Sequence, residues 1–183
     1  ASFVIPSTVT RIYGHAFASC SNLTSVTLPS NLQTLGNFVF LNCTNLTGDV
    51  VIPSTVTSMG WAPFSNTKIT SFSINNAYFT AVDGVLYNAA KTTLLQYPCG
   101  STGTTFAVPD GVTAISNNAF YNAANLTSIT ISSSVSSISD SAFNGCDNLA
   151  TVYIDSPTVA AMLTSKSAAT GLIQRATTVY VSE

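Results

Sequence analysis

The sequence predicts a β-rich solenoid, in which short turns of chain stack on one another around one continuous core. Three observations lead to this fold class. Phenylalanines recur at a nearly fixed spacing, apolar residues two positions apart follow each of them, and only 7% of the 183 residues are charged. A unit of about 23 residues cannot bury its own apolar face, so neighbouring units must share a core. We therefore expect a single domain over residues 1–183.

The repeat is defined by an anchor phenylalanine and by the apolar positions around it. The anchors are Phe17, Phe40, Phe64, Phe120 and Phe143, at separations of 23, 24, 56 and 23 residues. Each anchor is followed by an apolar set whose last two members lie two positions apart, as in Leu23-Val26-Leu28. This spacing is typical of a strand with one buried face. The residues just before each anchor predict one short helical turn at most.

The pattern Leu-x-x-Val-x-Leu-Pro-x-x-Leu-x-x-Leu-Gly-x-x-x-Phe-x-x-Cys over residues 23–43 resembles the BspA-like leucine-rich repeats of bacterial and protist surface proteins. Five copies cover most of the chain, and two of them carry Thr67 and Ala123 in place of the cysteine. The resemblance implies a leucine-rich repeat solenoid that is right-handed and curved, with a parallel sheet on its concave side. It also implies a surface protein, because relatives are associated with binding host matrix proteins, other cells or surfaces.

The long gap between the third and fourth anchors predicts an insertion. We expect three repeats in residues 1–74, the insertion in 75–105 and two repeats in 106–155. Inside the insertion, Asp83-Gly84 separates two short apolar-aromatic runs, which is the signal of an antiparallel β-hairpin. We expect this hairpin to project from the solenoid or to flank it.

The two ends of the sequence differ. The repeat stops at Ser156, where Ser156-Pro157 predicts the start of a helix. Residues 156–183 are therefore predicted to form a C-terminal cap that closes the core. The first residues already lie inside a repeat. Our hypothesis is that the chain is the C-terminal piece of a longer protein, or a processed form of one.

The sequence predicts no catalytic residues, cofactor or metal. His15 is the only histidine, and no motif supplies it with a nucleophile or an orienting partner, so we interpret it as a surface residue on a repeat turn. The acidic residues occupy different repeat positions, whereas a carbohydrate-active enzyme needs carboxylates that converge from neighbouring turns. Asp83-Gly84 and Asp110-Gly111 are interpreted as turn formers rather than calcium ligands.

The cysteines are interpreted as structural. Cys20, Cys43 and Cys146 share one repeat position, three residues after an anchor, and a recurring cysteine behaves as a small buried hydrophobe. No C-x-x-C pair indicates zinc. Cys20 and Cys43 lie on adjacent turns, about 5 Å apart by strand spacing, so a disulfide between them is sterically open. Cys99 falls outside this register, near the insertion, and could be exposed.

Composition excludes two classes of partner. Five Lys and Arg against seven Asp and Glu leave no basic stripe that could neutralise phosphates, which excludes nucleic acid. The apolar runs are far shorter than the roughly 18 residues that a membrane span needs, so we expect no membrane insertion by this segment.

What remains is a neutral surface rich in hydroxyl groups. The outward positions of the predicted strands carry Ser and Thr, with Asp49 and Val51 in the same row. Solenoids present such surfaces as binding platforms, and Tyr is favoured at interfaces. The predicted binding residues are Ser25, Thr27, Ser71, Ser73, Ser128, Thr130 and Tyr153 on the strands, and Tyr87 and Tyr97 in the insertion.

These observations favour a non-enzymatic adhesion or protein-interaction module, extracellular or at the cell surface. Its partner would be a protein or glycan ligand on host, matrix or neighbouring cells. Two alternatives stay open: a structural spacer of a larger surface protein, and, least favoured, a carbohydrate-active enzyme.

Overall fold

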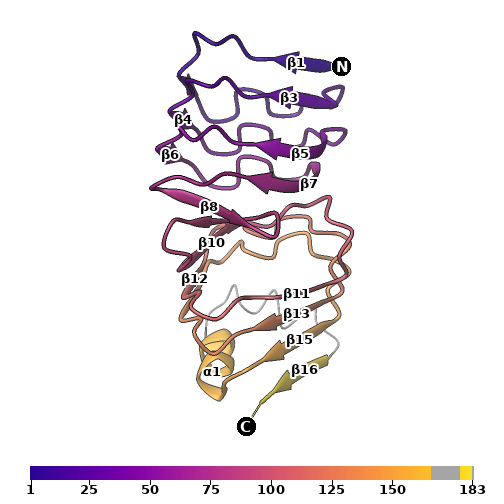
Figure 1. Ribbon diagram of the computed structural model, residues 1–183. Coiled ribbons are helices and arrows are strands. Elements are labelled where there is room, and N and C mark those ends of the chain that lie inside the picture. The colour runs from indigo at the N-terminus through magenta and orange to yellow at the C-terminus, as the bar shows by residue number, and fades with distance from the viewer. Residues whose placement is uncertain (166–177, 183) are drawn as a thin grey trace.

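Strands from successive turns stack along one face of the solenoid, which we call the strand face (Figure 1). The computed structural model describes residues 1–165 and 178–182. The paired strands run parallel, so the predicted parallel sheet and the β-solenoid fold are confirmed. The strands of this face are β1 (Ser2–Val4), β3 (Ser25–Thr27), β5 (Thr47–Val51), β7 (Lys68–Ser73), β11 (Thr105–Ala107), β13 (Ser128–Ile131), β15 (Thr151–Ile154) and β16 (Thr178–Val181).

A second set of strands, most of them two residues long, lines the core on a different side from the strand face (Figure 1). Each contributes an apolar residue that precedes an anchor; Leu35 and Ile115 are buried, whereas Met59 on β6 is half-buried. The first three pair in parallel, and so do the last three. The strands of this set are β2 (Arg11–Ile12), β4 (Thr34–Leu35), β6 (Ser58–Met59), β10 (Thr93–Gln96), β12 (Ala114–Ile115) and β14 (Ser137–Ile138).

The anchor phenylalanines stack on one another along the axis of the solenoid. Ring centroids lie 5.0 Å apart for Phe40 and Phe64, and 4.8 Å apart for Phe120 and Phe143, with nearly parallel planes. This separation matches the strand spacing of about 4.8 Å, because each ring belongs to one turn. Offset stacking of this kind adds to the stability that comes from burying the rings.

The inserted hairpin lies between two halves of the core. Strands β8 (Phe79–Val82) and β9 (Val85–Asn88) are antiparallel, as predicted. The hairpin closes back on β7: the Ala81 amide donates to the Ile74 carbonyl, and the Phe72 amide to the Gly84 carbonyl, both at 2.9 Å. Along β9, Leu86 packs into the N-terminal core, whereas Val85 and Tyr87 pack into the C-terminal core. The hairpin therefore divides the core rather than projecting from it.

The segment predicted as insertion also contains a further turn of the solenoid. Strand β10 pairs in parallel with β12, and Tyr97 stacks on Phe120 with ring centroids 5.2 Å apart. Tyr97 thus takes the place of an anchor. The inserted hairpin fills only the first part of residues 75–105, and the prediction of five turns missed one.

Two elements follow the last repeat in the described part of the chain. Helix α1 (Pro157–Ser165) begins where the sequence predicts, and the Thr158 amide donates to the Ser156 hydroxyl at 3.2 Å. Val159 is buried against the C-terminal core. Strand β16 then pairs in parallel with β15. The rest of the predicted cap, residues 166–177 and 183, lies outside the described residues.

Candidate functional site

The outward residues of the strand face form two columns, because parallel strands in register place equivalent side chains side by side. Asp49 pairs with Ser71 and Val51 with Ser73 in the N-terminal half. In the C-terminal half, Ser128 pairs with Thr151, and Thr130 with Tyr153. Of the predicted strand-face residues, Ser25, Thr27, Ser73 and Tyr153 are exposed, and Ser71, Ser128 and Thr130 are half-buried.

The hairpin separates these columns into two patches. Its turn at Gly84 lies against Ser71: a Cβ added to Gly84 would stand 2.8 Å from the Ser71 Cβ. Ser71 is half-buried for this reason. Ser25, Thr27, Ser71 and Ser73 therefore form an N-terminal patch, and Ser128, Thr130 and Tyr153 a C-terminal one.

The C-terminal patch ends in a pair of tyrosines. Tyr153 on β15 and Tyr180 on β16 stack with ring centroids 5.0 Å apart and planes only 10° from parallel. They remain 42% and 53% exposed. Tyr153 is one of the binding residues predicted from the sequence, and Tyr180 is not. Tyr180 lies in a segment that does not follow the repeat, so its register against β15 could not be read from the sequence.

Tyr87 and Tyr97 do not belong to the surface, which corrects their selection as binding residues. Tyr87 is 3% exposed and Tyr97 5% exposed. Tyr87 faces the C-terminal core from β9, and burial, helped by Asp83, raises its pKa to about 12. Tyr97 fills an anchor position, with its hydroxyl 3.1 Å from the Ser101 hydroxyl. Both are favoured in the core because their rings supply the apolar area that the repeat needs.

Asp49 places a fixed negative charge on the N-terminal patch. Its Oδ1 accepts a hydrogen bond from the Thr70 hydroxyl at 2.8 Å. Hydrogen bonding from the Ser71 side chain, and then from Thr70, lowers the pKa of Asp49, so the carboxyl is ionised at neutral pH. Within residues 1–165 and 178–182, no Lys, Arg or His forms an ion pair with it.

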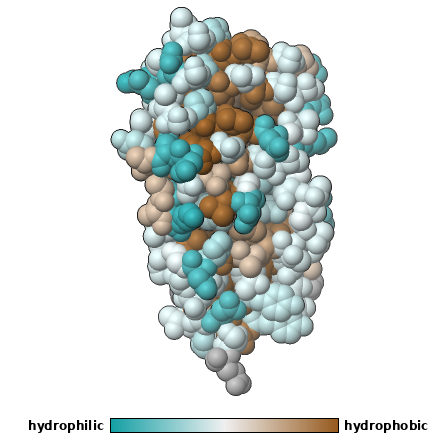
Figure 2. All heavy atoms as spheres, viewed as in Figure 1, coloured by the Kyte–Doolittle hydropathy of each residue, from teal (hydrophilic) through white to brown (hydrophobic). Residues whose placement is uncertain are grey.

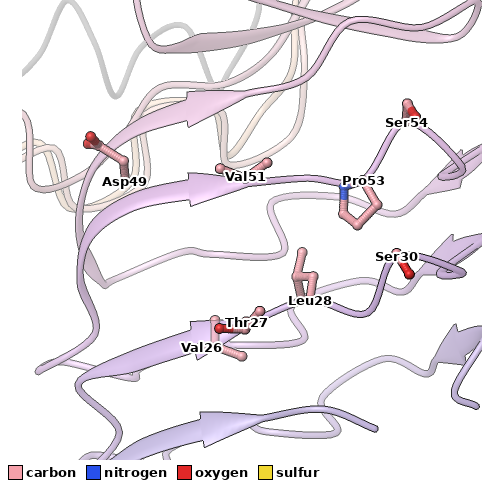
Figure 3. Close-up of a pocket in the computed structure, with 8 residues that line it drawn as sticks. All are labelled: Val26, Thr27, Leu28, Ser30, Asp49, Val51, Pro53 and Ser54. Atoms are coloured by element: carbon pink, nitrogen blue, oxygen red, sulfur yellow. The ribbon is translucent and has the colours of Figure 1, made fainter. Parts of the chain in front are cut away.

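A hollow of about 500 Å³ opens beside this carboxylate, between β3 and β5. Asp49 lies at one end of it, Val51 in the middle, and the turns that carry Ser30 and Ser54 at the other end (Figure 3). Val51 is 69% exposed although it is aliphatic. Figure 2 shows hydrophobic residues, in brown, gathered along the middle of the molecule on this side, most densely in its upper half.

The other candidate groups form no chemical centre. His15 is exposed and stacks on Phe38 at 5.5 Å. Among the described residues, no three His, Cys, Asp or Glu side chains could together hold a metal ion. No helix of the described chain is both long enough and apolar enough to cross a bilayer.

The cysteines correct two expectations. Cys43 and Cys146 are buried as predicted, and their thiols donate to the carbonyls of the preceding anchors Phe17 and Phe120 at 3.0 and 2.9 Å. Cys20 is exposed, because the first turn has no described turn before it. Cys99 is buried, with its thiol 3.0 Å from the Tyr121 carbonyl. All four lie in the described chain, and none forms a disulfide.

Comparison with known proteins identifies the repeat. The BspA type leucine rich repeat region matches residues 1–93 and 95–165 in six copies, one more than the anchors alone indicate. The chain belongs to this family. The sixth copy agrees with the turn that Tyr97 anchors. No protein of curated function matches the chain.

Solved structures share the solenoid fold. A leucine-rich repeat protein from Eubacterium ventriosum is 26% identical, with a TM-score of 0.66 over 84% of this chain and 54% of its own. The pneumococcal vaccine antigen PcpA is 19% identical, with a TM-score of 0.63 over 83% of this chain and 52% of its own. A leucine rich cell surface protein from Faecalibacterium prausnitzii is 18% identical, with a TM-score of 0.54 over all of this chain and 79% of its own. The chain thus spans about half the length of the first two.

Proposed function

We propose that this chain is a non-enzymatic adhesion and protein-interaction module of a secreted or cell-surface protein. It binds protein or glycan ligands of host, matrix or neighbouring cells through its strand face. The buried Tyr87 holds the hairpin in place, and the buried Tyr97 holds the additional turn that follows it. The hairpin therefore contributes to binding by shaping the strand face.

The observation that carries this proposal is the character of the strand face. Exposed hydroxyl groups, the Tyr153–Tyr180 pair and the exposed Val51 lie on hydrogen-bonded parallel strands. Ordered hydroxyl and tyrosine side chains bind partners at a low entropic cost, because the sheet already holds them in place. Membership of a repeat family with a cell-surface protein among its similar structures supports the proposed location.

The test is binding to an array of immobilised matrix proteins and glycans. Ser25→Arg and Ser128→Arg each place a bulky charge on one patch of the strand face. Ser58→Arg is the matched control, because Ser58 is an exposed serine on β6, on a different side of the core. We expect at least one array ligand to lose binding with a strand-face variant and to keep it with Ser58→Arg.

The same experiment separates the alternatives. Binding that survives both strand-face variants contradicts the proposal. A chain that binds nothing on the array, while the larger protein that contains it does bind, is a structural spacer. Turnover of any polysaccharide on the array favours a carbohydrate-active enzyme.

A further inference from the structure

We propose that the hollow between β3 and β5 binds a lysine or arginine side chain from an extended segment of a partner protein. This inference rests on the proposed function and names the chemistry of one contact on the strand face. The occupant is defined by the two parts of the hollow, a prearranged carboxylate and an apolar wall.

The carboxylate is held ready for a cation. The Thr70 hydroxyl donates to Asp49 Oδ1 at 2.8 Å, and hydrogen bonding from the Ser71 and Thr70 side chains lowers the pKa of the carboxyl. These bonds fix the charge in position without neutralising it, and no described cation pairs with it. A fixed, unpaired carboxylate attracts an ammonium or guanidinium group, which forms stronger hydrogen bonds with it than a neutral donor does.

The apolar wall fits the stem of such a side chain. Val26, Leu28, Val51 and Pro53 line the hollow between Asp49 and the two serines. Figure 3 shows Val51 following Asp49 along β5, with Pro53 just beyond the end of that strand. Lys and Arg bury their methylene stems on apolar surface while the charged end reaches a polar group. One Lys or Arg side chain would therefore both pair with the carboxylate and cover the exposed Val51.

The opening of the hollow favours an extended segment. Its residues come from the ends of two parallel strands and from the turns at Ser30 and Ser54. A segment lying along β3 and β5 could direct alternate side chains toward the sheet, because successive side chains of an extended chain point to opposite sides. A metal ion fits less well, because Asp49 is the only carboxylate that lines this hollow and hard cations take several oxygen ligands.

The test uses blocked pentapeptides Gly-Val-Xaa-Val-Gly, in which Xaa is arginine, lysine or the uncharged arginine analogue citrulline. Each is titrated into the isotope-labelled chain and followed by amide chemical shifts. We expect the two cationic peptides to shift the amides of residues 26–30 and 49–54, and citrulline to shift them far less. Asp49→Asn should lower the affinity for the cationic peptides by about fivefold, which is the effect of losing one exposed ion pair.

Matched variants separate the two parts of the hollow. Asp110→Asn removes an exposed acid elsewhere and should change nothing. Val51→Ser should lower the affinity for the cationic peptides. Val4→Ser is the control and should leave it unchanged, because Val4 is also 69% exposed but does not line the hollow. Equal shifts with citrulline, or cationic shifts that survive Asp49→Asn, overturn the inference.

The peptides need no macromolecular ligand, so this result is independent of the array. Peptide binding at the hollow with no array ligand sensitive to the strand face overturns the proposed function alone. An array ligand lost with Ser25→Arg, without selective binding of the cationic peptides, overturns only the inference about the hollow.

Discussion

The backbone amide of Phe64 donates to the side-chain Oε1 of Gln96 at 3.4 Å. At other turns, the anchor amide donates to the backbone carbonyl of the residue before the next anchor, as Phe40 does to Pro63 and Phe120 to Ala142. Gln96 precedes the anchor Tyr97, so its side chain replaces a carbonyl that the hairpin displaces. Gln96 is only 1% exposed in an apolar core, and this bond gives its Oε1 a partner, whereas its Nε2 has none among the described residues. The bond is one of those that join the two halves of the solenoid.

Replacing Gln96 with leucine should destabilise the chain. The substitution leaves the buried Phe64 amide without its acceptor, which costs about 1–3 kcal/mol, and the removal of the unpartnered Gln96 Nε2 offsets part of this cost. The free energy of unfolding, measured in denaturant, checks this. Gln33→Leu is the control, because Gln33 is exposed and its side chain should contribute little. An equal effect of both variants would contradict the role of Gln96.

Replacing Gly84 with alanine should loosen the hairpin from β7. Gly84 has a φ of 77°, and an added Cβ would meet the Ser71 Cβ at 2.8 Å. Gly111 is a matched control, because its φ is 88° and nothing lies within 4 Å of its added Cβ. Gly111→Ala should cost about 1 kcal/mol for the backbone conformation alone. Gly84→Ala should cost more and should speed hydrogen exchange in residues 79–88; equal costs would show that the hairpin does not pack as described.

One of the four thiols should react quickly with a disulfide reagent. Cys20 is exposed, whereas Cys43, Cys99 and Cys146 are buried. Burial also raises the pKa of Cys43 and Cys99, which lowers their thiolate fraction. We expect one fast equivalent in the native chain, its loss in Cys20→Ser, and all four after unfolding. Fast labelling of Cys99 would contradict its buried position.

Alkaline pH should weaken the C-terminal core through Tyr87. Burial, and then Asp83, raises its pKa to about 12, so the folded state favours the protonated phenol. The stability that this provides is complete below the unfolded pKa near 10 and is lost as pH rises toward 12. Unfolding measured between pH 9 and 12 should show a steeper loss in the native chain than in Tyr87→Phe. Identical pH dependence would contradict the assignment.

Much of the fold follows from the sequence because the repeat encodes it locally. Anchors such as Phe40 and Phe120 mark their turns by a fixed distance to the preceding apolar residue, five positions back. The additional turn, between those of Phe64 and Phe120, was missed because its anchor, Tyr97, is a tyrosine and lies only three positions after Leu94. The stacking of Tyr97 on Phe120 and the pairing of β10 with β12 show this turn in the structure, whereas the spacing of residues along the sequence does not.

The strand-face residues were predicted better than the hairpin residues for a physical reason. Alternation along a strand settles which side chains point outward, so Thr27 and Tyr153 are exposed as expected. Alternation cannot show which side of a hairpin the rest of the molecule covers. Tyr87 is therefore of a residue type that is common at interfaces, but its position is in the core. The hollow beside Asp49 depends on packing between turns, which no single repeat specifies.

The most direct test of the binding role is the hydrogen-exchange footprint of a bound array ligand. On complex formation we expect slower exchange in the strand face, in β3 and β5, in β13 and β15, or in both pairs, with β4, β6, β12 and β14 unchanged. Protection confined to β4, β6, β12 and β14 would place the contact on a different side of the core and would contradict the strand face as the binding surface.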